Sequence, residues 1–111
     1  MKLLEKILEE NPQKIEKLRS NILKLQQQKL EIEEKIRLWK NEKNEIILND
    51  SSLKNDKMRN LALENFKNSS EDYKKLEIDL KTNKLKIDKN VIKLQKLIDE
   101  QENARAFCKI K

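Results

Sequence analysis

Residues 71–107, EDYKKLEIDLKTNKLKIDKNVIKLQKLIDEQENARAF, decide the fold of this chain. Apolar side chains recur there at steps of three and four residues, or multiples of those steps, and neither Gly nor Pro interrupts the run. This main seam comprises Tyr73, Leu76, Leu80, Ile87, Leu94 and Leu97, with Asn83 and Asn90 at intervening positions. The period predicts a long amphipathic helix, and because a lone helix cannot bury its seam, the helix must pack against another.

The composition of the whole chain favours helices. The 111 residues include no Gly and one Pro, and 41% are charged against 36% hydrophobic. Sheet proteins need glycine-bearing turns, and a chain this polar can bury only a narrow core. We therefore predict an all-α fold, an elongated helical hairpin or coiled coil in which two long helices are joined by a short helical segment.

Three breaks divide the predicted single domain, residues 1–111. Asn11 before Pro12 is typical of a helix cap and restart, and the polar run 49–52 predicts a reversal. Ser69, followed three residues later by Asp72, resembles a capping box. These signals predict a short helix over 1–10, a long helix over 12–48, a short helix over 53–67 and a second long helix over 70–108.

The first long helix carries its own seam, which polar residues interrupt. Lys29 and Lys43 occupy seam positions, either as devices that restrict register and partner number or as side chains that snorkel to the surface. Trp39 fits a seam residue better than a platform for stacking bases. The predicted seam comprises Ile15, Leu18, Ile22, Leu25, Ile32, Ile36, Trp39 and Ile46.

A second apolar line predicts association between copies. Ile78, Leu85 and Ile92 repeat every seven residues on the side of the second long helix away from its main seam. A helix with two apolar faces needs more than one neighbour, so we expect a homo-oligomer of more than two chains. The predicted oligomerisation residues are Ile22, Leu25, Ile36, Trp39, Leu76, Ile78, Leu80, Leu85, Ile87, Ile92 and Leu94.

The residue inventory argues against an enzyme. There is no His, no Gly for a phosphate-binding loop, and only one Cys. We therefore expect no catalytic residue, metal, cofactor or small-molecule substrate. No apolar stretch is long enough to cross a bilayer, so no membrane role is expected either.

One charged face stands out from the overall net charge of +6. Between Lys81 and Lys96 six lysines accompany a single acid, Asp88. Four of them form a stripe about 15 Å long on one helix face, namely Lys86, Lys89, Lys93 and Lys96. The stripe is either a non-specific dock for a nucleic-acid backbone or the solvated face of a protein with 22 Lys and 4 Arg.

Three runs in the second half of the chain have a shared layout. Residues 53–59 (LKNDKMR) and 71–76 (EDYKKL) precede the long periodic helix, which closes on residues 104–107 (ARAF). This layout resembles the UvsY-like recombination mediators of T-even phages. The resemblance implies a helical oligomer that binds single-stranded DNA and helps a RecA-class recombinase displace the single-strand-binding protein. It implies that Lys54, Lys57 and Arg59 lie with the stripe on the DNA side.

Two functional hypotheses follow. The first is a non-enzymatic oligomer that binds single-stranded DNA as a recombination mediator, in the cytoplasm of a bacterial host cell if the protein is phage-encoded. The second is a coiled-coil interaction module, an adaptor or a small phage inhibitor of a host defence complex, that binds protein and no nucleic acid.

Overall fold

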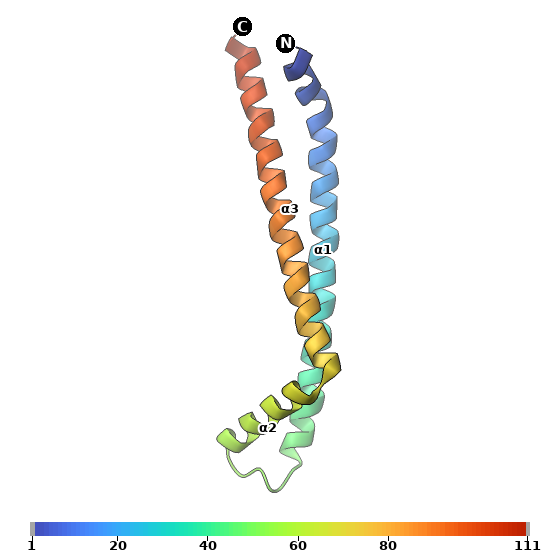
Figure 1. The fold of residues 1–111 in the computed structure, drawn as a ribbon, viewed down its shortest axis with the longest axis vertical. Coiled ribbons are helices and arrows are strands. Elements are labelled where there is room, and N and C mark those ends of the chain that lie inside the picture. The colour runs from blue at the N-terminus through green and yellow to red at the C-terminus, as the bar shows by residue number, and fades with distance from the viewer. Residues whose placement is uncertain (1, 111) are drawn as a thin grey trace. The chain divides into compact units, whose positions relative to one another are not determined.

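The computed structural model describes residues 2–110, which form three helices (Figure 1). α1 spans Lys2–Leu48, α2 spans Asp56–Ser69 and α3 spans Glu71–Ile110. No strand occurs among residues 2–110. The all-α fold class is therefore confirmed, with two long helices joined by a short helical segment. No helix in this part of the chain has both the length and the apolarity needed to traverse a bilayer.

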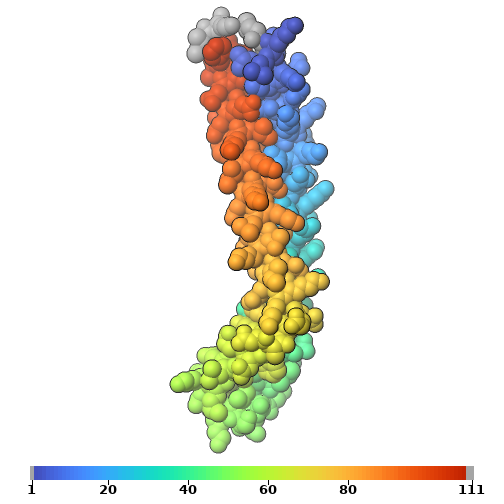
Figure 2. All heavy atoms as spheres, in the orientation of Figure 1, coloured from blue at the N-terminus to red at the C-terminus, as the bar shows by residue number. Residues whose placement is uncertain are grey.

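The chain divides into two compact units. Unit 1 combines Met1–Gln27 with Lys84–Lys111, and unit 2 is Gln28–Asn83. In unit 1 the first part of α1 runs antiparallel to the last part of α3, with the two chain ends at the same end of the pair (Figure 1). Figure 2 shows the atoms of these two segments in contact along their length.

Unit 1 is held by one narrow seam. Ile22 and Ala104 are its buried apolar residues, and two amide side chains, Asn11 and Gln101, are buried between the helices. The other seam side chains are half-buried, as a pair of helices without a third neighbour requires. The seam comprises Leu4, Leu8, Asn11, Ile15, Leu18, Ile22 and Leu25 of α1 and Ile87, Asn90, Leu94, Leu97, Gln101 and Ala104 of α3.

Unit 2 has a wider core that contains aromatic rings. The rings of Trp39 and Tyr73 lie with their centroids 4.4 Å apart, and Tyr73 is only 4% exposed. The predicted seam position of Ile46 is wrong, because Ile46 is 48% exposed whereas Ile47 is 3% exposed. An α-helix drifts by about 20° per heptad relative to a strict seven-residue repeat, so after four heptads the packed line has moved to the next residue.

α1 continues through Pro12, which corrects the predicted break between residues 10 and 12. Asn11 is not an N-cap but a buried residue inside the helix. Pro12 cannot donate the backbone hydrogen bond that the Leu8 carbonyl would accept, but its ring lies on an exposed face and not in the seam. The seam residues on either side of Pro12 continue without interruption, so packing against α3 offsets the lost bond.

α2 begins three residues later than predicted. Asp50 closes the turn after α1, because its Oδ1 accepts hydrogen bonds from the Ser52 backbone N at 2.9 Å and from Ser52 Oγ at 2.6 Å. Asn55 is the N-cap of α2, and its Oδ1 accepts from Met58 N at 2.9 Å. Asn is among the strongest N-cap residues, so α2 begins directly after Asn55 and not at Leu53.

The start of α3 is capped by Ser70 and not by the predicted Ser69. Tyr73 N donates to Ser70 Oγ at 3.1 Å. Ser69 is the last residue of α2, where its hydroxyl donates to the Asn65 carbonyl at 2.8 Å. The two serines thus have opposite roles, because one hydroxyl accepts at a helix start and the other donates at a helix end.

Candidate nucleic-acid interface

The predicted lysine stripe is an exposed face of α3 in unit 1. Lys86, Lys89, Lys93 and Lys96 all have exposed side chains. Within residues 2–110 none of the four forms an ion pair. Four neighbouring ammonium groups are therefore open to an external anion.

Three lysines of α1 share this side of unit 1. Lys14 lines the same surface pocket as Glu100 of α3, and Glu100 lies one turn beyond Lys96 on the same helix face. Lys17 and Lys24 follow Lys14 at spacings of three and ten residues, which brings them to the adjoining outer face of α1, where they line a surface pocket with Glu16. The sequence alone did not reveal this grouping, because some 70 residues separate the two sets of lysines and only the register of the pair aligns them.

We call this surface the lysine side of unit 1. Three acids, Glu10, Glu16 and Glu100, accompany its lysines, and Glu10 Oε2 lies 3.6 Å from Lys14 Nζ. Seven ammonium groups therefore stand against three carboxylates, which gives this surface a positive excess. The lysine side comprises Lys14, Lys17, Lys24, Lys86, Lys89, Lys93 and Lys96.

The opposite side of unit 1, which we call the arginine side, has a different balance of charge. Arg19 of α1 and Arg105 of α3 line one pocket that crosses the two helices. Four basic residues on this side, Arg19, Lys84, Arg105 and Lys109, stand against four acids, Glu5, Glu9, Asp88 and Glu102. The net charge of the protein is thus concentrated on one side of unit 1 and not spread around the helix pair.

The other predicted DNA-binding residues lie in unit 2. Lys54 and Lys57 are exposed, in the turn before α2 and in its first turn. Arg59 is half-buried, and its Nη1 lies 3.7 Å from Asp56 Oδ1. Because the lysine side belongs to unit 1, these three residues are not part of it, and their role on the DNA side stays a prediction.

Most predicted oligomerisation residues pack inside the single chain. Ile22 is buried, and seven others are half-buried on the seams between α1 and α3, namely Leu25, Ile36, Trp39, Leu76, Leu80, Ile87 and Leu94. The remaining three are exposed, with Ile78 at 64%, Leu85 at 56% and Ile92 at 57%. These three repeat every seven residues along α3, Ile78 in unit 2 and the other two in unit 1, and we call them the apolar line.

The two seam lysines snorkel toward the surface. Lys29 Nζ lies 3.7 Å from Glu33 Oε1 on the same helix. Lys43 Nζ lies 5.7 Å from the ring centroid of Trp39 and 5.4 Å from that of Phe66. The aliphatic parts of both side chains thus pack in the seam. The ammonium group of Lys29 lies near a carboxylate, and that of Lys43 lies near two aromatic rings. Trp39 is a seam residue, as predicted, because its ring packs on Tyr73.

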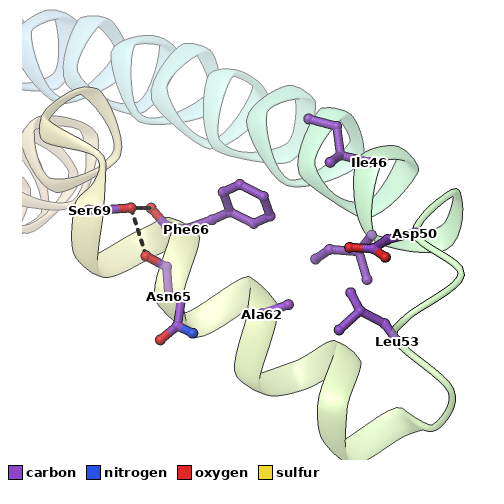
Figure 3. A pocket seen from close by; sticks show the side chains of 8 residues that line it. Ile46, Asp50, Leu53, Ala62, Asn65, Phe66 and Ser69 are labelled. Carbon is purple, nitrogen blue, oxygen red and sulfur yellow. Dashed lines mark hydrogen bonds between the residues drawn. The ribbon is translucent and has the colours of Figure 1, made fainter.

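A pocket of about 300 Å³ lies between the end of α1 and α2 in unit 2. Figure 3 shows Ile46, Leu53, Ala62 and Phe66 around it, with Asp50 at its edge. The hydrogen bonds from Ser52 hold the pKa of Asp50 below its usual value, so this carboxylate is ionised and fixed in the turn. The pocket lining therefore offers an apolar surface but no pair of groups for acid–base or nucleophilic chemistry.

Comparisons with known proteins identify no relative. No family model, no curated protein and no solved structure is detectably similar to this chain.

Proposed function

We propose that the protein is a non-enzymatic, oligomeric helical protein that binds single-stranded DNA without sequence preference through the lysine side of unit 1. In this role it would act as a recombination mediator, transferring strands covered by single-strand-binding protein to a RecA-class recombinase. The observation that carries the proposal is the convergence of lysines from α1 and α3 on one side of unit 1, against three acids.

The chemistry of the lysine side favours the backbone of the nucleic acid over its bases. Lysine presents a compact charge on a flexible stem, whereas base readout uses planar, bidentate side chains such as arginine. The lysine side has no arginine, and its residues in α1 and α3 include no Trp or Tyr on which bases could stack. Phosphate contacts of this kind position a strand and carry no sequence information.

Association between copies would multiply the binding surface. The apolar line Ile78, Leu85 and Ile92 is exposed on α3, as are Val91 and Phe107, and burying it against another chain would place several lysine sides in one particle. We expect more than two chains per particle in light scattering or native mass spectrometry. A monomer at micromolar concentration would contradict this part of the proposal.

The direct test is the salt dependence of binding to single-stranded DNA. Each phosphate contact contributes a slope of about −0.7 in a plot of log affinity against log salt, so seven lysines give a slope of about −5. Reversing the charge of the stripe, with Lys86, Lys89, Lys93 and Lys96 changed to Glu, should leave a slope of about −2 or abolish binding. Helicity measured by circular dichroism should not change. Unchanged affinity in this variant rejects the proposal.

A control variant with the same change in net charge separates a specific surface from overall charge. Lys35, Lys40, Lys74 and Lys81 belong to unit 2, and none of them forms an ion pair within residues 2–110. Changing these four to Glu should reduce affinity much less than reversing the stripe. Equal losses in the two variants would mean that the protein responds only to net charge.

The exposed apolar line favours a second candidate function, a coiled-coil module that binds another protein. Ile78, Leu85 and Ile92 present an unpartnered face of the kind that interaction helices use. This function predicts no affinity for DNA at physiological salt and a defined complex with one partner protein. The complex should be lost when Leu85 is changed to Glu, whereas reversal of the stripe should leave it intact.

A further inference from the structure

The arginine side of unit 1 contains a pocket of about 340 Å³ that crosses the two helices. α1 contributes Arg19 and α3 contributes Arg105, while Pro12 and Ile98 supply apolar walls. Pockets that bind small ligands are of this size or larger and contain polar groups that fix orientation. The pocket lies on the side of unit 1 opposite to the lysine side.

The two arginines of this pocket are unusual within the chain. The protein has four arginines, and the other two are paired on their own helices, Arg37 with Glu34 and Arg59 with Asp56. Within residues 2–110, Arg19 and Arg105 form no ion pair, although acids are abundant on their side of unit 1. Half of the guanidinium groups in the chain therefore line one pocket without a carboxylate partner.

The antiparallel arrangement of α1 and α3 in unit 1 favours an approach of the two guanidinium groups (Figure 1). A long side chain in a helix tends to lean toward the N-terminus of its own helix. The N-terminal direction of α1 is the C-terminal direction of α3, so we expect Arg19 and Arg105 to lean toward the middle of the pocket that both line. Two planar groups with fixed N–H donors can then bind one multivalent anion between them.

Acceptor groups on α3 restrict the ligand further. Gln101 also lines the pocket, and its side chain is 6% exposed, with an Oε1 that accepts no hydrogen bond within residues 2–110. The terminal torsion of a Gln side chain is soft, so a small rotation presents this oxygen to the pocket. Glu102 adds a second acceptor at the edge of the pocket. A matching ligand therefore carries an anion for the arginines and a hydrogen-bond donor beside it.

We propose that this pocket binds a phosphate monoester, with the phosphate between Arg19 and Arg105 and an adjacent hydroxyl or amino group donating to Gln101 or Glu102. The phosphate belongs to a free mononucleotide or to the phosphorylated end of a nucleic-acid strand, which share this chemistry. The proposal does not depend on DNA binding by the lysine side, because it uses different residues on the opposite side of unit 1.

Calorimetric titration of the full chain with adenosine monophosphate tests the site. We expect saturable binding at millimolar concentration or below, and weaker binding of adenosine, which lacks the phosphate. Changing Arg19 or Arg105 to Gln should reduce affinity at least about tenfold, because each removes hydrogen bonds to a charged group. Arg19→Lys should recover part of the loss, since it restores charge but not the planar donor pair.

Matched variants make the result specific to the pocket. Arg37→Gln removes a guanidinium in unit 2 and should leave affinity unchanged. Gln101→Leu should weaken adenosine monophosphate severalfold while circular dichroism shows unchanged helicity. No binding by the native chain, or full binding by the Arg19→Gln, Arg105→Gln double variant, would overturn the proposal.

Two oligonucleotide arms identify the source of the phosphate and separate this site from the lysine side. One titration compares a strand with a terminal phosphate and the same strand ending in a hydroxyl. Tighter binding of the phosphorylated strand assigns the pocket to strand ends. Equal affinities, with adenosine monophosphate still bound, assign it to free monoesters. Reversal of the lysine stripe should leave binding of adenosine monophosphate intact, so failure of the DNA proposal and failure of this one give different results.

Discussion

The two units of this protein are built on the same pair of helices but have different cores. Unit 2 packs Trp39 against Tyr73 and adds α2, so its seam buries aromatic rings on more than one side. Unit 1 has a strip of aliphatic residues one helix wide, with the amides of Asn11 and Gln101 buried within it. Large aromatic side chains contribute the most burial per residue, whereas a buried amide without a partner costs free energy.

The two units therefore contribute different properties to the protein. We expect unit 2 to supply the larger share of the stability, whereas unit 1 carries the two charged surfaces. The lysine side and the arginine side are opposite sides of a thin pair of helices, where every side chain outside the seam is close to solvent. A narrow core is therefore what allows two differently charged faces to be displayed by so few residues.

The largest expected effect tests the aromatic core of unit 2. Trp39→Ala should lower the free energy of unfolding by about 3 kcal/mol, because it removes the ring that packs on Tyr73 and that Lys43 covers. Leu38→Ala, one residue earlier on an exposed face, should change it by less than about 0.5 kcal/mol. Chemical denaturation followed by circular dichroism measures both. Similar losses for the two variants would contradict the packed position of Trp39.

Pro12 provides a test in unit 1, where a substitution should raise the free energy of unfolding. If α1 is continuous, Pro12→Ala restores a backbone hydrogen bond inside a helix and should raise the free energy of unfolding by about 2 kcal/mol. If a new helix began at Pro12, the proline would be favourable and the alanine variant would be no more stable. Thermal and urea unfolding of the two proteins decide between these structures.

Tyr73 predicts a pH dependence that belongs to unit 2. Burial, with a hydrogen bond to Glu77 and the charges of Glu77 and Glu64, raises the pKa of Tyr73 to about 12 from a usual value of 10.0. The folded state thus favours the neutral phenol. Its contribution to the free energy of unfolding is therefore complete below pH 10.0 and is lost as the pH rises through about 12. The loss is on the order of 2 kcal/mol.

Tyr73 is the only tyrosine, so the ultraviolet absorbance of tyrosinate follows it directly. Tyr73→Phe should remove the corresponding fall in stability over that pH range. Titration of the native protein near the usual pKa of tyrosine would show that the phenol is exposed, contrary to the packing of unit 2.

The sequence predicted the helices and their seams because both follow from the period of apolar residues. The positions of Tyr73, Leu76 and Leu80 fix a face without any knowledge of the partner helix. Local signals were less reliable, since Asn11 and Pro12 read as a break that packing overrides, and Ser70 and not Ser69 caps α3.

The composition of the two charged sides could not be predicted in full. The stripe on α3 is visible as a local spacing, but Lys14, Lys17 and Lys24 join it only through the register of α1 against α3. The same holds for Arg19 and Arg105, which are 86 positions apart in the sequence and share one pocket in unit 1. A surface shared by two helices depends on their alignment, which a single sequence does not fix.

We propose that α1 and α3 build one DNA-binding surface, and a variant confined to α1 tests this most directly. Changing Lys14, Lys17 and Lys24 to Glu should weaken binding to single-stranded DNA at least about tenfold and make the salt slope shallower by about 2, with helicity unchanged. Changing Lys35, Lys40 and Lys74 in unit 2 to Glu is the matched control and should have a much smaller effect. An unaltered salt slope in the α1 variant would show that the lysines of the two helices do not form a common surface.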